Sequence, residues 1–189
     1  PELAEADLRG VRLEEAVLRG GNLASRDLSG CSFLACDLRG AEFQGALLAD
    51  ADFSGSDLEG ADSREAKLNA AVLESANLTG SDFSNAEVVW SHFTGARMEG
   101  AVLTATRFER TDFEGTGLSS ARIQGTSFRR CRMTGLSFQG RDLSGCDLSN
   151  ADLSDADLRN ASLRNAVADG CDLHCDVLPV NENTFICFI

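Results

Sequence analysis

Cysteine and histidine are the side chains in this sequence best suited to bind a metal ion or to form disulfides. Seven Cys and two His occur among 189 residues, enough for a disulfide framework or a zinc site. Cys171, His174 and Cys175 lie close together near the end of the chain, but their spacing matches no established zinc motif. No nucleophile elbow, phosphate-binding loop or dinucleotide fingerprint accompanies them. The role of these residues therefore depends on the elements that carry them.

A five-residue period runs from Pro1 to Val180 without a change of register. The third residue of each unit is Leu, Phe or another apolar residue, except at Ser63 and Ala168. The first residue is usually small, the second is often Asp, and the fifth is often Gly or another small or polar residue. Such a period fits neither an α-helix (about 3.6) nor a strand (about 2). Since one unit cannot bury its own apolar residue, the pattern predicts stacked units with a shared core.

The repeat resembles that of the pentapeptide-repeat family. The runs ADLSDADLRN (151–160) and ANLTGSDFSN (76–85) follow its order of a small residue, Asp or Asn, Leu or Phe, and two small or polar residues. The resemblance covers residues 1–180 and implies an all-β fold, a right-handed quadrilateral parallel β-helix with four units per coil. It also implies that the first and third residues point inward. These repeats would make about nine coils, and residues 181–189 would form a C-terminal tail or cap.

On this lattice, residues 20 apart in sequence stack on one another, and the ladders between coils should run unbroken. The cysteines at the inward first position should behave as small apolar residues; they are Cys31, Cys36, Cys131, Cys146 and Cys171. Cys131 and Cys171 share a column but lie two coils, about 10 Å, apart, which is too far for a disulfide. Only Cys175 and Cys187 remain available to pair with each other.

His92 and His174 lie four coils, about 20 Å, apart along the axis, so they cannot share a metal or a substrate. Asp recurs at the second position of the repeat on every face, and many carboxylate pairs therefore arise from periodicity alone. We expect no catalytic residue, no metal, no cofactor and no enzymatic activity.

The charge of the chain is uneven along its length. Thirty acidic and seventeen basic residues give a net charge of −13, with −10 in residues 1–90, +3 in residues 91–140 and −6 in residues 141–189. This balance argues against direct nucleic-acid binding and favours protein partners. The rod should have acidic ends and a basic band between them.

One outer corner of the basic band combines Trp90 with Arg110 and Arg130, which are 20 residues apart and should stack. Trp and Arg are the residue types most enriched in binding hot spots. The candidate partner-binding surface, called here the Trp90 corner, comprises Val89, Trp90, His92, Arg107, Arg110, Arg129, Arg130 and Arg132. A simpler interpretation is a local cation–π pair on a solvated surface that binds nothing.

Two functions are consistent with these features. The first is a rigid protein-interaction or scaffold module, such as a subunit of a larger assembly. The alternative is a DNA mimic, because the resemblance includes quinolone-resistance-type members that present an acidic rod of about duplex width to a type II topoisomerase such as gyrase. The basic band and the lack of a loop insertion or a C-terminal dimerisation helix favour the scaffold.

No apolar run is long enough to span a membrane, so we expect no transmembrane segment. Similar proteins occur in the cytoplasm and in the photosynthetic lumen. The resemblance therefore leaves the compartment open between the cytoplasm and an organelle, with a thylakoid location included.

Overall fold

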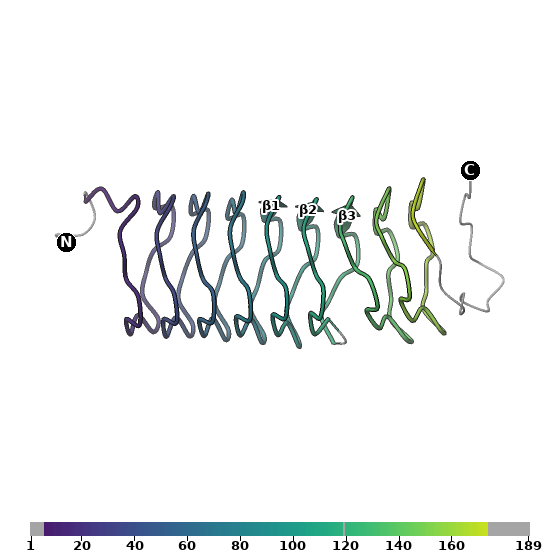
Figure 1. Cartoon of the computed structure of the whole chain (residues 1–189), viewed down its shortest axis with the longest axis horizontal. Coiled ribbons are helices and arrows are strands. Elements are labelled where there is room, and N and C mark those ends of the chain that lie inside the picture. Colours follow the sequence, from purple (N-terminus) through teal and green to yellow (C-terminus); the bar gives the residue numbers. More distant parts are fainter. Residues whose placement is uncertain (1–5, 119, 174–189) are drawn as a thin grey trace.

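The computed structural model describes residues 6–118 and 120–173, which form one rod of stacked coils (Figure 1). Backbone bridges join residues 20 apart, from Arg12–Ser32 to Asp152–Asp172, and all of them are parallel. One coil is therefore four five-residue units, as the repeat predicts. The last repeats and the predicted tail at 181–189 lie outside the described residues.

Three strands extend beyond a single bridge. They are β1 (Glu87–Val89), β2 (Arg107–Glu109) and β3 (Ser127–Arg129), which form one parallel sheet in the order β1-β2-β3. The central residue of each strand is buried and the flanking residues face outward. Each strand is the straight part of one unit on the same side of the rod, so this side is the most regular of the four.

The chemistry of each repeat position explains why the chain bends every five residues. The fifth residue takes a left-handed conformation, with φ of 64° at Gly40 and 58° at Asn160, and Gly and Asn tolerate this region best. The second residue, often Asp, stabilises the turn: the Ser54 amide donates to Asp52 Oδ1 at 2.9 Å. Gly, Asn and Asp are therefore turn-forming residues in this repeat.

The first residue of a unit lies against the coil that precedes it. The Thr126 hydroxyl donates to the Leu103 carbonyl at 2.6 Å, and the Cys146 thiol donates to the Ile123 carbonyl at 3.0 Å. A small side chain fits between coils at this place, and a hydroxyl or thiol gains a partner there. This contact accounts for the recurrence of Ala, Ser, Thr and Cys.

The third residues fill the core in stacked columns. Phe33 and Phe53 stack with ring centroids 4.8 Å apart, and Phe93 and Phe113 stack at 5.4 Å. The coil at residues 61–80 contains no Phe and carries Ser63, which is only 2% exposed. The Ser63 amide still donates to the next coil at 2.7 Å, so the register passes through this coil unchanged.

The prediction of unbroken ladders is wrong at two places in the described residues: at Asp7–Asp27, near the start of the rod, and in the later coils. Between Arg12 and Asp172, two expected backbone pairs are missing among the described residues: Gly117–Ser137 and Arg122–Asp142. Ser137 and Asp142 belong to units whose first residues are large, whereas the first residue is usually small. These large residues are Leu136 and Arg141. The cause is analysed below.

Replacing Phe53 with Ala should lower the free energy of unfolding by about 3–5 kcal/mol, because its ring is 1% exposed and stacks on Phe33. Glu74→Ala, at an exposed position, should change it by less than about 0.5 kcal/mol. Denaturant titration measures both values. Equal losses for the two variants would contradict the assignment of inward and outward positions.

Two substitutions at the left-handed fifth position of a unit should change the stability of the protein in opposite directions. Ala70→Gly should stabilise the protein by about 1 kcal/mol, because Ala70 has a φ of 56° that Gly adopts without steric strain. Gly40→Ala should destabilise it by a similar amount, since an added Cβ meets nothing within 4 Å and only the backbone is strained. Thermal unfolding would refute the explanation if both variants shifted the midpoint in the same direction.

Candidate protein-interaction surface

The corner that follows β1, β2 and β3 presents Trp90, Arg110 and Arg130 at the fifth position of three successive coils. Their φ angles are 59°, 53° and 55°, so all three are in the left-handed region. Bulky side chains are uncommon in this conformation, where Gly and Asn are preferred. The predicted stacking of these residues at an offset of 20 follows from the register of the sheet.

Trp90 and Arg110 are in direct contact. The Arg110 guanidinium carbon lies 4.4 Å from the centroid of the Trp90 ring, within cation–π range. The indole is nevertheless 56% exposed. Within the described part of the chain, Arg110 has no carboxylate partner. The local cation–π pair therefore forms and still leaves an aromatic surface and a cation accessible.

Arg107 and Arg130 are neutralised by acidic neighbours. Arg107 pairs with Glu87 at 3.2 Å and with Glu109 at 2.9 Å, and Arg130 pairs with Glu109 at 3.1 Å. The hydrogen bond from Arg107, and then that from Arg130, lowers the pKa of Glu109 below its ordinary value. Glu109 therefore remains ionised and offsets the positive charge at the centre of the sheet.

Arg132 and Arg129 are also paired. Arg132 bonds Asp112 at 2.8 Å and also Glu114, and these bonds raise the pKa of its guanidinium, with Glu114 the larger contributor. Arg129 lies 3.6 Å from Asp147. Exposed ion pairs contribute little to stability, but they place a carboxylate beside each of these arginines.

The remaining two residues of the Trp90 corner flank the indole. Val89 is half-buried in β1 and pairs with Glu109 of β2, while His92 is exposed on the adjoining face and its backbone pairs with Asp112. The eight predicted residues thus occupy two adjoining faces and their shared corner. Direct side-chain contact among them is recorded for Trp90 and Arg110.

The sequence reading missed the acidic partners of these arginines. Glu109 lies two residues after Arg107 and 21 before Arg130, and Asp112 lies 20 before Arg132. The lattice rule that predicted the arginine stack also predicts these pairs, provided that it is applied to the acidic residues. Counting charge along the sequence alone hides them.

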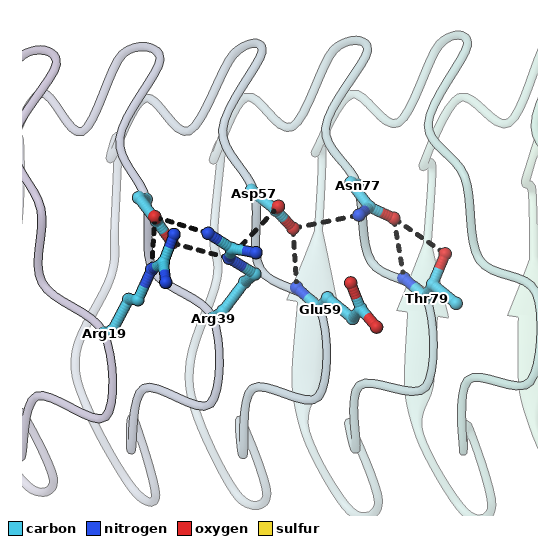
Figure 2. Close-up of polar contacts among 7 residues, drawn as sticks. Arg19, Arg39, Asp57, Glu59, Asn77 and Thr79 are labelled. Atoms are coloured by element: carbon cyan, nitrogen blue, oxygen red, sulfur yellow. Dashed lines mark hydrogen bonds and ion pairs between the residues drawn. The ribbon is translucent and has the colours of Figure 1, made fainter.

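The acidic face of the early coils is partly neutralised as well (Figure 2). Arg39 pairs with Asp37 at 2.8 Å and approaches Asp57 at 3.5 Å. Asn77 in the next coil donates to Asp57 at 2.9 Å and caps the turn at Thr79. This side of the rod is therefore a ladder of alternating polar contacts rather than a row of free carboxylates.

The cysteines of the described region are structural. Cys31, Cys36, Cys131 and Cys146 are buried free thiols, and Cys171 is partly exposed. Burial raises the pKa of Cys131 and of Cys146 to about 12, so both thiols stay protonated at neutral pH. His174, Cys175 and Cys187 lie outside the described residues, so their predicted roles stay untested.

No cluster of three or more His, Cys, Asp or Glu in the described residues could hold a metal ion. A polar hollow of about 380 Å³ is lined by Ser25, Gln44, Gly45, Arg64 and Glu65. Its arginine is fixed by two hydrogen bonds to Asp62, at 2.9 and 2.6 Å. Glu65 is the one carboxylate among these lining residues, and no hydrogen bond joins it to the Ser25 hydroxyl in the described structure.

The chain belongs to the pentapeptide-repeat family. The family model for pentapeptide repeats matches it in eight overlapping copies that together span residues 2–174. This match establishes the β-helix of that family as the fold and confirms the resemblance drawn from the repeats. A search of curated proteins found no match.

Solved structures with this fold include three kinds of protein. A trypsin-treated variant of QnrB1, a plasmid-mediated fluoroquinolone resistance protein, is 20% identical over 89% of this chain and 84% of its own, with a TM-score of 0.58. HetL, involved in heterocyst differentiation regulation in the cyanobacterium Nostoc sp. strain PCC 7120, is 24% identical over 84% and 85%, with a TM-score of 0.40. A pentapeptide-repeat protein from the Arabidopsis thaliana thylakoid lumen is 34% identical over 56% and 66%, with a TM-score of 0.43.

The likeness to QnrB1 supports the right-handed β-helix and nothing finer, given the low identity. Among the residues that the structure describes, no helix has the length and apolar character needed to cross a membrane.

Native protein treated with iodoacetamide at pH 8 should not be labelled at Cys131 or Cys146, because a pKa of about 12 leaves almost no thiolate at that pH. Both residues should react fully in denaturant, which serves as the control. Peptide mass mapping measures the labelling. Rapid modification of Cys131 in the folded protein would show that the coil is open there.

Proposed function

We propose that this protein is a non-enzymatic, rigid protein-interaction module that docks through the Trp90 corner. The observation that carries this proposal is an exposed indole stacked against an arginine that has no carboxylate partner among the described residues. An interface in which Trp and Arg are buried together is typical of a binding hot spot. Such a module could be one subunit of a larger assembly.

The backbone of the corner supports the same proposal. Trp90, Arg110 and Arg130 adopt positive φ where Gly would be unstrained, and each costs on the order of 1 kcal/mol. Strained conformations of this kind cluster at functional sites. The same conformation recurs at the fifth position along the rod, as at Glu65 and Ala70, so the feature particular to the corner is the size of its three side chains in successive coils.

The charges of the corner define the partner. Arg107, Arg130 and Arg132 are already paired with carboxylates, which leaves Arg110 as the cation available to an incoming group. We expect a protein surface that places one carboxylate against Arg110 and an apolar side chain on the free part of the indole. Desolvation of the guanidinium would then strengthen both contacts.

The alternative is a DNA mimic that binds a type II topoisomerase. It is favoured by the net charge of −10 in residues 1–90, which precede the basic band. Against it stand the ion pairs and amide contacts on the face that carries Asp37 and Asp57, which leave few free carboxylates there. The fold shared with a fluoroquinolone resistance protein does not decide between the two.

Wild-type protein, Trp90→Ala and Arg110→Ser should be compared as baits in the native lysate, with Val167→Ala as a matched control at an exposed apolar position away from the corner. A partner recovered with wild type and Val167→Ala should be lost with the two corner variants. With the isolated partner, Trp90→Ala should weaken binding by about 2 kcal/mol, or roughly thirtyfold. Circular dichroism should show unchanged folding, since the indole points outward.

The alternative is tested in parallel with a gyrase supercoiling assay at several salt concentrations. Salt-sensitive inhibition that Trp90→Ala leaves intact would replace the corner with the acidic faces as the functional surface. Equal recovery of one partner by all four baits would also contradict docking through the corner.

A further inference from the structure

The backbone ladder is interrupted on one side of the rod, where the two missing pairs lie in consecutive units of the chain. This interruption is called the slit below. Gly117 and Ser137 are opposite each other in one unit, and Arg122 and Asp142 are opposite each other in the next, yet neither pair forms a bridge. Every other expected pair between Arg12 and Asp172 in the described residues is present. Figure 1 shows the coils splayed at this level, on the side away from β1, β2 and β3.

The side chains at the first position of two successive units explain the slit. At most other described units a small residue occupies this place, as Thr116 does when it donates to the Phe93 carbonyl of the preceding coil at 2.9 Å. Arg26 is an exception: it donates to the Ala6 carbonyl at 2.6 Å, and the neighbouring Asp7–Asp27 pair also forms no bridge. Leu136 and Arg141 occupy the equivalent place after the slit. Leu136 is 5% exposed, so its bulk lies inside and pushes its coil away from the one before it.

Arg141 replaces part of the lost ladder. Its guanidinium donates to the Ala121 carbonyl. In a regular coil this carbonyl would accept from the Asp142 amide, just as the Ala61 carbonyl accepts from the Asp82 amide at 2.9 Å. The Arg141 Nε is buried and has no hydrogen-bond partner in the described structure. A side-chain bond therefore stands where the Asp142 amide would otherwise join the coils, while the Gly125 amide still donates to the Ser144 carbonyl at 3.1 Å. The buried Arg141 Nε is left unsatisfied.

The opposite side of the rod stays joined at the same level. The Ser127 amide of β3 donates to Thr106 at 3.0 Å, and the Asp147 amide donates to Thr126 at 3.0 Å. Asp112 and Arg132 also form a regular bridge on the adjoining face. The coils before and after the slit are thus joined by regular ladders on two faces, whereas the other two faces lack their bridges.

We propose that the rod is jointed at this slit, with Leu136 and Arg141 as a wedge and the sheet of β1, β2 and β3 as the pivot. The coils on each side tilt as rigid blocks, because their own ladders are complete, while the interrupted faces open and close. The joint is a property of the chain whatever binds the Trp90 corner.

Hydrogen exchange followed by NMR tests the slit in the unmodified protein. The amides of Ser137 and Asp142 should exchange at least about tenfold faster than those of Ser127 and Asp147, which lie at the same level on the joined side. Equal protection of the two sets would overturn the proposal. This comparison needs no variant, so a folding defect cannot obscure it.

The wedge is tested with the double variant Leu136→Ala and Arg141→Ala, which restores small first residues. The Ser137 and Asp142 amides should then become as protected as Ser127 and Asp147. A folded double variant with unchanged exchange would show that another cause holds the slit open.

The tilt is tested with pairs of spin labels three coils apart on one face. Labels at Thr104→Cys and Arg164→Cys span the slit, and labels at Gln44→Cys and Thr104→Cys span the same number of regular coils. The background changes three cysteines to Ser: Cys171, Cys175 and Cys187. In pulsed electron resonance, the pair that spans the slit should give the broader distribution of distances between labels. The Leu136→Ala and Arg141→Ala double variant should narrow that distribution. Equal widths for the two pairs in the otherwise unchanged protein would contradict the tilt and mean that the rod is rigid.

Discussion

The backbone hydrogen bonds between residues 20 apart are the constraint on which the rest of this structure depends. They fix each coil at four units, and they place the third residue of each unit in one of four inward columns. The small first residue, the turn-capping second residue and the left-handed fifth residue are all requirements for closing a coil at that spacing. A surface residue therefore has neighbours that are set by the ladder rather than by its local sequence.

Much of the fold could be predicted because one short rule is repeated. The five-residue period gave the inward Phe stack, and Phe33 and Phe53 lie where it placed them. It also assigned Cys131 and Cys146 to inward positions as small apolar residues, and both are buried. The slit could not be predicted from periodicity, because Leu136 and Arg141 preserve the register while breaking the size rule, and only packing shows the consequence.

The Trp90 corner was predicted less completely. The stack of Trp90 on Arg110 followed from their offset, and the 4.4 Å contact agrees with it. The net charge of +3 in residues 91–140 already includes Glu109, whose pairing with Arg107 and Arg130 decides where in the band the positive charge lies. Charge summed along a sequence says little about a surface on which residues 18 to 21 apart are neighbours. What distinguishes the corner is an accessible aromatic ring stacked on Arg110, which has no carboxylate partner among the described residues.

The uniform offset between coils also has a consequence for how the chain folds. Each new coil closes a loop of the same length onto the coil before it, so no distant contact has to form first, and structure can spread from any coil to its neighbours. At the slit this spreading lacks two backbone bridges and gains a bond from the Arg141 guanidinium to the Ala121 carbonyl. We therefore expect structure to spread less readily across the slit than within the stretches on either side of it.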